Sequence, residues 1–170
     1  MRFSYRQPTQ SDCPRLSVLF NQVYIDTYGL EGVSHEFTNF IAAKFSVEKL
    51  QRDIASDQYD FWIATYRDNL VGVILIEHTK ACPIGDFVGP EVNKLYMLRR
   101  FFGTGVGQQL MECAETDLRA KGEKKVWLWA GAENARAIHF YKKMDYEWIG
   151  NAPFKMEVNT YNNVVMVKEL

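Results

Sequence analysis

The feature that most constrains this chain is a glycine-rich turn between an apolar run and a helical pattern. It reads "LYMLRRFFGTGVGQQL" over residues 95–110, with Gly103, Gly105 and Gly107 spaced two positions apart. Glycine permits a positive φ and leaves no side chain between its N–H and a ligand. At a helix N-terminus, four N–H groups lack intrahelical acceptors and carry the positive end of the helix dipole. The pattern therefore predicts a strand, a loop suited to phosphate, and a helix.

Two common nucleotide-binding patterns do not fit this turn. A Walker A loop requires Gly-Lys followed by Ser or Thr, and the chain contains no such tripeptide. A dinucleotide fingerprint requires G-x-G-x-x-G after the first strand of a doubly wound sheet. Here the spacing is G-x-G-x-G, and the strand before it is the fourth expected. The motif alone leaves open a turn that binds no ligand.

Hydrophobic periodicity predicts an α/β fold around the turn. One helix is expected to begin at Ser11 and Asp12, a second helical region ends at Phe45, and a further helical pattern follows the Ser46 cap. Later helices are expected between the glycine turn and Gly122, and from the Asn134 cap. The order β-αα-βββ-α-β-α-ββ predicts a mixed sheet of about seven strands flanked by about four helices. A right-handed crossover makes the fourth and fifth strands parallel neighbours. Residues 79–90 are expected to form a loop. The strands are expected at residues 2–7, 61–66, 70–78, 91–98, 125–130, 146–151 and 163–170.

Length and composition narrow the class of protein. A chain of 170 residues predicts a single domain over 1–170. Lys and Arg total 20 against 21 Asp and Glu, which argues against a nucleic-acid binder. The sequence has neither a signal-peptide core nor a run of about 20 apolar residues, so we expect a cytoplasmic protein without membrane attachment. Cys13, Cys82 and Cys113 match no metal-ligand spacing, and no metal is expected.

Two linked motifs resemble those of the GNAT N-acetyltransferase superfamily. "LYMLRRFFGTGVGQQL" resembles its acetyl-CoA signature, and "NARAIHFYKKMDY" matches N-x-x-A-x-x-F-Y-x-x-x-G-F, with Asn134 and Tyr141 seven residues apart. Residues 23–55 and 152–170 look like the bacterial PaiA-type branch, which acetylates spermidine and spermine. The chain departs from the family at Phe102, where a Gln or Arg is usual unless Arg100 fills that position in a shifted register. It also departs at Asp145, where glycine is usual, which suggests a different turn conformation, although Asp tolerates the left-handed region better than most residues.

The resemblance implies a GNAT-like fold and acetyl-CoA as cosubstrate. Backbone groups of one strand would pair with the pantetheine arm and polarise the thioester carbonyl, and the glycine turn would bind the pyrophosphate. Asn134 would bind the amide arm of the cofactor, although Asn is also a favoured helix N-cap. Tyr141 would be the general acid that protonates the CoA thiolate, although core packing also suits it. The implied cofactor-binding residues are Leu95, Tyr96, Met97, Gly103, Thr104, Gly105, Val106, Gly107, Gln108, Asn134 and Tyr141.

The base is less defined by the sequence. Glu91 and Glu77 are the candidate carboxylates, acting through water, with a solvated strand end as the alternative for each; His78 and His35 are weaker candidates. Ribosomal-protein acetylating relatives have a glutamate where Trp129 stands, which argues against that branch. Phe154 and Tyr161 could wall the acceptor site or simply pack in the core. An acidic groove of Asp26, Glu31 and Glu36 would suit a polycation, although exposed carboxylates on helices are common.

These observations lead to one expected function and two alternatives. We expect acetyl transfer from acetyl-CoA to a primary amine of a small acceptor such as spermidine or spermine, by direct attack in a ternary complex. One alternative is a protein N-terminal or lysine acetyltransferase, and the other is a non-catalytic acyl-CoA sensor. Apart from the small-molecule amine the sequence indicates no partner, and it leaves a homodimer open.

Overall fold

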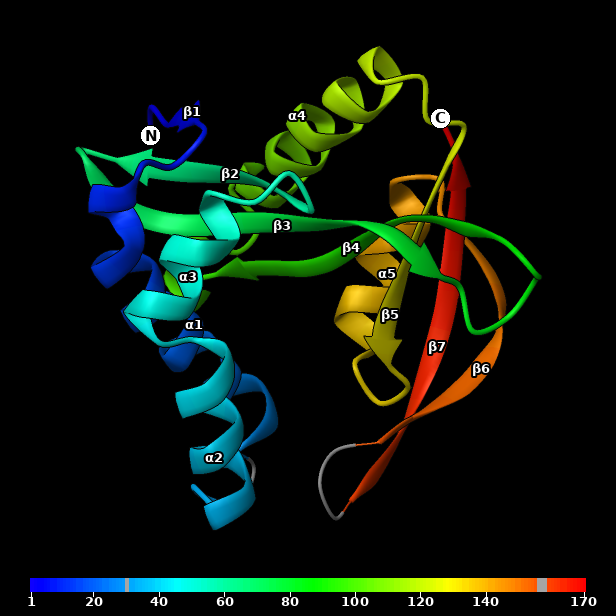
Figure 1. Ribbon diagram of the computed structural model, residues 1–170, viewed down its shortest axis with the longest axis horizontal. Coiled ribbons are helices and arrows are strands. Elements are labelled where there is room, and N and C mark those ends of the chain that lie inside the picture. The colour runs from blue at the N-terminus through cyan, green and yellow to red at the C-terminus, as the bar shows by residue number, and fades with distance from the viewer. Residues whose placement is uncertain (30, 156–158) are drawn as a thin grey trace. The chain divides into compact units, whose positions relative to one another are not determined.

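The computed structural model describes residues 1–29, 31–155 and 159–170. The chain divides into two compact units (Figure 1). Unit 1 contains Met1–Leu75 and Lys94–Ala114, and unit 2 contains Ile76–Asn93 and Glu115–Leu170. Strands β3 and β4 and helix α4 each contribute residues to both units. No helix among these described residues is long and apolar enough to cross a membrane.

The predicted α/β architecture is confirmed. A seven-stranded mixed sheet has the order β1-β2-β3-β4-β5-β7-β6. Its strands are β1 (Ser4–Arg6), β2 (Tyr59–Tyr66), β3 (Asn69–Ala81), β4 (Val88–Met97), β5 (Lys125–Gly131), β6 (Glu147–Lys155) and β7 (Thr160–Glu169). The α-helices of the described residues are α1 (Cys13–Tyr28), α2 (His35–Lys44), α3 (Val47–Ile54), α4 (Val106–Ala120) and α5 (Ala135–Lys143).

The early helical region holds one helix more than the expected order gives it. Helix α2 begins after Ser34, whose hydroxyl accepts from Phe37 N–H at 3.2 Å. Helix α3 begins after Ser46, whose hydroxyl accepts from Lys49 N–H at 3.2 Å, as the sequence predicts. Because each segment has its own cap, the region through Ile54 forms three helices in place of two.

An aromatic cluster forms the core of unit 1 beneath α1. Helices α1 and α3 pack on each other, and α3 contacts β2 (Figure 1). Phe20 stacks on Phe45, with ring centroids 5.1 Å apart, and contacts Tyr96 of β4 at 5.6 Å. Tyr24 stacks on Phe40 at 4.9 Å. This cluster fixes β4 from the α1 side at the strand that leads into the glycine turn.

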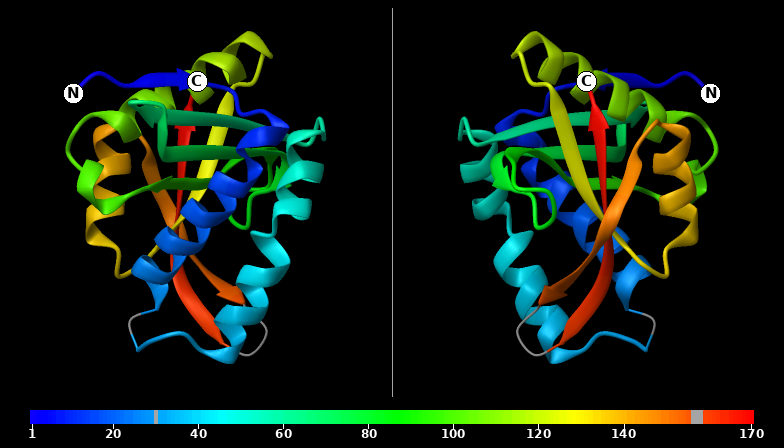
Figure 2. Two further views of the ribbon diagram at one scale, coloured as in Figure 1. Left: turned by 90° about the vertical axis from the view of Figure 1, so that its left-hand side faces the viewer. Right: turned by 90° about the vertical axis from the view of Figure 1, so that its right-hand side faces the viewer.

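In unit 2, β7 pairs antiparallel with both β5 and β6, and β6 and β7 form a long twisted hairpin (Figure 2). Strands β4 and β5 pair in parallel, with Glu91 opposite Trp127 and Val92 opposite Leu128. The parallel pairing predicted from the crossover is therefore confirmed. Trp127, Val165 and Ala152 of this sheet form one buried cluster with Cys82.

The predicted loop over residues 79–90 is too long. Strand β3 continues to Ala81, and β4 begins at Val88. Cys82 N–H donates to the Phe87 carbonyl oxygen at 2.9 Å, which closes a short hairpin connection. The prediction treated Pro90 as a loop residue because proline lacks an N–H. Pro90 instead stands near the start of a strand, where proline is tolerated.

Candidate active site

The predicted site residues are distributed between the two units. Unit 1 holds the end of β4, the glycine turn and the first part of α4. Unit 2 holds Glu91, Asn134 and Tyr141.

The glycine turn has the backbone geometry that only glycine adopts readily. Gly103 has φ 73° and Gly105 has φ 86°, both in the left-handed region. A β-carbon built on either residue would meet no atom within 4 Å, so open space lies beside both α-carbons. Crowding therefore does not explain these glycines; the backbone conformation does. Such a turn directs successive N–H groups into one concavity, which is an arrangement that binds anions.

Helix α4 adds N–H groups to this concavity. Gln109 N–H donates to the Gly105 carbonyl at 3.0 Å, so the N–H groups of Val106, Gly107 and Gln108 precede the first regular bond of the helix. Val106 is fully buried and anchors the turn in the core. The Thr104 hydroxyl donates to the Phe101 carbonyl at 2.6 Å, so this side chain braces the turn itself. The residues present thus fit a diphosphate held by main-chain amides.

The strand before the turn alternates between the two faces of the sheet. Tyr96 is buried, whereas Leu95 and Met97 are half-buried. A β-carbon on Gly72 of β3 would lie 3.0 Å from Met97 Cγ and 3.3 Å from Leu110 Cδ1. Gly72 therefore allows close packing of β4 and α4, a role that sequence reasoning missed within the apolar run "LVGVILIEH". Phe102 is half-buried and directly precedes Gly103, whereas Arg100 is exposed.

In unit 2, Asn134 is the N-cap of α5. Its Oδ1 accepts from Ala137 N–H at 3.1 Å. Asn134 therefore has the N-cap role that the sequence offered as an alternative. This role uses the side-chain oxygen and leaves the NH₂ group as a donor for a ligand. Tyr141 lies in the last turn of α5, two residues before Lys143, and is 8% exposed. Its ring contacts Phe140 at 5.3 Å and Tyr146 at 5.8 Å.

The two candidate carboxylates occupy different environments. Glu91 is 5% exposed and lies in the parallel ladder opposite Trp127. Burial is the main cause that raises the pKa of the Cys82 thiol, and the charge of Glu91 raises this pKa further. Glu77 accepts from Asn93 Nδ2 at 3.0 Å and pairs with Lys80 at 3.4 Å. These contacts give Glu77 a structural role at the end of β3.

The candidate histidines lie in ordinary surroundings. His78 has its Nε2 3.5 Å from Lys121 Nζ. His35 is exposed at the first position of α2.

Aromatic side chains line the β5–β7–β6 sheet. Trp129 is half-buried and contacts Trp127 at 5.9 Å and Phe154 at 6.1 Å. Phe154 is 37% exposed and stands opposite Tyr161 in the β6–β7 ladder. Trp129, Phe154 and Tyr161 are each partly exposed, whereas Trp127 is buried.

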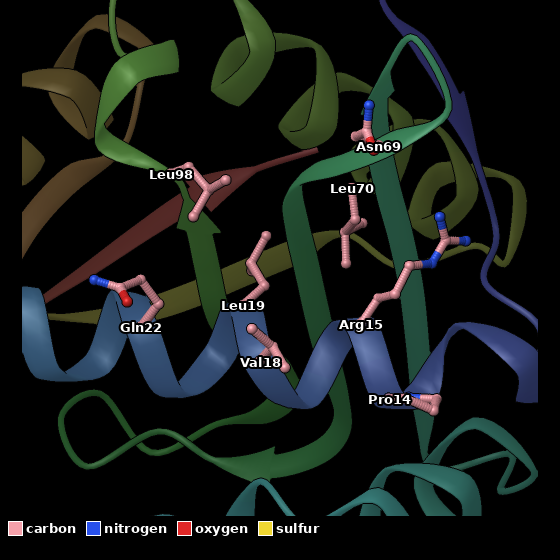
Figure 3. Close-up of a pocket in the computed structure, with 8 residues that line it drawn as sticks. All are labelled: Pro14, Arg15, Val18, Leu19, Gln22, Asn69, Leu70 and Leu98. Atoms are coloured by element: carbon pink, nitrogen blue, oxygen red, sulfur yellow. The ribbon is translucent and has the colours of Figure 1, made fainter.

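A cavity of about 620 Å³ lies in unit 1 at α1 (Figure 3). Leu19 of α1 points towards Leu70 and Leu98 across it, whereas Val18 is 70% exposed. The lining residues are Pro14, Arg15, Val18, Leu19, Gln22, Asn69, Leu70 and Leu98. None of the predicted cofactor-binding or catalytic residues is among them, so the cavity is distinct from the glycine turn.

Comparisons with known proteins agree with this geometry. The family model described as "Acetyltransferase (GNAT) family" matches residues 28–146. An uncharacterized N-acetyltransferase of Mycobacterium tuberculosis is 27% identical over 132 residues, covering 78% of this chain and 81% of the relative. One from Lactobacillus delbrueckii subsp. lactis is 24% identical over 136 residues, covering 79% of each.

Two solved structures share the fold. The PaiA N-acetyltransferase of Thermoplasma acidophilum, solved in complex with coenzyme A, has a TM-score of 0.76 at 21% identity and covers 100% of both chains. A ribosomal-protein-alanine N-acetyltransferase from Brucella melitensis has a TM-score of 0.73 at 16% identity and covers 98% of this chain and 99% of its own.

Proposed function

Because this chain belongs to the acetyltransferase (GNAT) family and is an acetyl-CoA-dependent enzyme, we propose that it acetylates a primary amine of a small polyamine-like acceptor. The observation that carries the cosubstrate assignment is the left-handed glycine turn, with open space beside Gly103 and Gly105. We further propose that both units form one acetyltransferase domain over residues 1–170.

The proposed cofactor contacts follow from the turn and its neighbours. Main-chain N–H groups from Gly103 to Gln108 hold the pyrophosphate, and the side chain of Asn134 binds the amide arm. Backbone groups of Leu95, Tyr96 and Met97 pair with the pantetheine arm. Bound acetyl-CoA supplies an activated thioester. Main-chain donors on β4 polarise its carbonyl, and such preorganised dipoles need no reorganisation during the reaction.

Tyr141 is the proposed general acid. A phenol of ordinary pKa, about 10, stays protonated at neutral pH and can donate to a departing thiolate whose thiol pKa is about 8.5.

Removing a proton from the acceptor amine is the second requirement. A primary amine of pKa about 10.4 costs about 4.6 kcal/mol to deprotonate at pH 7. Glu91 is the proposed base. It lies four positions before Leu95 on β4, about 13 Å of extended strand, so the proton must travel through ordered water.

The acceptor class is supported by the composition of unit 1 between Arg15 and Lys44. Residues 16–43 contain no Lys or Arg but include Asp26, Glu31 and Glu36. Asp26 and Glu31 are exposed, and Glu36 is buried in the first turn of α2. Tyr28 is 42% exposed and contacts Tyr24 at 4.8 Å. Carboxylates and aromatic faces together favour a cation of the polyamine kind.

The test is an acceptor screen that follows CoA release with spermidine, spermine, aminoglycosides, amino acids and peptides. We expect turnover with polyamines. Turnover with peptides alone would defeat the acceptor class in favour of a protein acetyltransferase. CoA binding without turnover on any amine would indicate an acyl-CoA sensor.

Tyr141→Phe tests the general acid in the same assay. We expect kcat to fall about 100-fold or more, because general acids contribute about 10²–10⁴-fold. The Kd for CoA should stay within about twofold, since the ring is retained. Unchanged kcat would remove Tyr141 from this role.

A further inference from the structure

A buried carboxylate in unit 2 lies outside the proposed chemistry. Glu115 of α4 is 3% exposed. Its Oε2 accepts from Lys168 Nζ at 2.7 Å and from Arg119 at 3.4 Å, and its Oε1 accepts from the Tyr146 hydroxyl at 3.2 Å. A buried charge is tolerated when it is paired and hydrogen-bonded in this way. Glu115 is therefore a fixed anchor point, with one oxygen committed to Tyr146.

Tyr146 is in turn tied to Tyr141 through the end of helix α5. The Tyr146 N–H donates to the Tyr141 carbonyl at 3.0 Å, and the Asp145 N–H donates to the Lys142 carbonyl at 3.1 Å. Asp145 has φ 65° between them. This is a Schellman motif, in which the residue after the left-handed position contacts the last turn of the helix. The two tyrosine rings make that contact, with centroids 5.8 Å apart at 58°.

The hydroxyl of Tyr146 does not release its proton at neutral pH. Burial and the adjacent Glu115 charge raise the pKa of Tyr146 well above its ordinary value, so the phenol remains protonated. Lys168 Nζ lies 5.6 Å from its ring centroid. The ring is thus held at one end by the backbone of Tyr141 and at the other by Glu115.

We propose that Tyr146, anchored by Glu115, is a positioning residue that fixes the ring of Tyr141 for proton donation. The inference rests on the proposed function, in which Tyr141 is the general acid. Small displacements of a reacting group lower rates strongly. Loss of the anchor should therefore lower turnover more than cofactor binding.

A double-mutant cycle tests this role. We expect Tyr146→Phe to lower kcat roughly 10-fold, with the KM for acetyl-CoA within about twofold. In a Tyr141→Phe background, the same change should cost almost nothing further, because Tyr146 acts through Tyr141. Equal factors in both backgrounds would overturn the positioning role while leaving acetyl transfer intact.

Glu115→Gln separates positioning from stability. One end of the amide can still hydrogen-bond to the Tyr146 hydroxyl, as acceptor or as donor, but the charge that pairs with Lys168 is lost. We expect this variant to unfold at a lower urea concentration than Tyr146→Phe and yet retain a higher kcat. If kcat instead follows stability across the two variants, Tyr146 has a structural role only, and the inference is overturned. A folded wild-type protein that acetylates no amine would overturn the proposed function and this inference together.

Discussion

The substitution Gly105→Ala tests whether the glycine turn binds the diphosphate of CoA. Gly122→Ala is its matched control. The two glycines flank α4 and have nearly the same φ, 86° and 84°. At each, an added β-carbon would meet no atom within 4 Å. Their cost in stability should therefore be similar. Placing an L-residue in the left-handed region costs about 1–2 kcal/mol, and we expect both variants to lose that much unfolding free energy.

The two variants should differ in affinity for CoA. At Gly105, the added methyl occupies the open space beside the proposed diphosphate and would displace at least one charge-assisted hydrogen bond, worth about 1.5–3 kcal/mol. That loss corresponds to a roughly 10- to 100-fold higher Kd. At Gly122, the methyl points into space beyond the C-terminal end of α4, so the Kd should stay within about twofold.

Urea unfolding and titration calorimetry with CoA measure the two quantities on the same samples. Wild-type affinity in Gly105→Ala would refute the proposal that this turn cradles phosphate. An equal loss of affinity in Gly122→Ala would show that binding merely follows stability. The proposal requires similar unfolding free energies and clearly different Kd values.

Two further changes test the backbone and the charges. Asp145→Gly should raise the unfolding free energy by about 1 kcal/mol, because glycine relieves the left-handed strain at the end of α5. A lower unfolding free energy in urea titration would show that the Asp145 side chain is itself stabilising. Asp12 is fully buried, and hydrogen bonds from Arg6, Thr9 and Arg15 hold its carboxyl pKa well below the ordinary value. Its contribution is therefore present above pH about 4 and is lost as the pH falls further. Asp12→Asn should cost about 2–3 kcal/mol at pH 7 and less at pH 3; a difference that is independent of pH would contradict the lowered pKa.

Features with a local physical cause could be predicted from the sequence. Gly122 ends α4 as expected: it has φ 84°, its N–H donates to the Arg119 carbonyl at 3.0 Å, and Glu123 N–H donates to the Leu118 carbonyl at 3.0 Å. Asp145 is a correction: its side chain suggested a different turn conformation from that of glycine, yet it has φ 65° in the left-handed region, which Asp tolerates better than most residues. The parallel pairing of β4 with β5 follows from the handedness of a strand–helix–strand connection.

Features that depend on distant residues could not be predicted in this way. Glu115 meets Tyr146 and Lys168 across 31 and 53 positions of the chain, and no periodicity marks such a cluster. Asp12 is the N-cap residue of α1, as expected, but its carboxylate makes no hydrogen bond to that helix. It accepts from Thr9 N–H and pairs with Arg6 and Arg15, near neighbours among which sequence spacing does not decide. In both cases the carboxylate could bond to several partners. A buried charge must be paired, so the cation that lies beside it in the folded protein becomes its partner.

Helix α4 follows the glycine turn and contains Glu115. Its first turn extends the glycine turn, and Glu115 lies ten positions after Gly105, about 15 Å along the same helix. Groups so far apart with no shared partner contribute independently to free energies. Losses of CoA affinity should therefore come from the turn, and losses of kcat at constant affinity should come from the Glu115–Tyr146 pair. A helix that merely transmitted general instability would lower both quantities together, whichever end was changed.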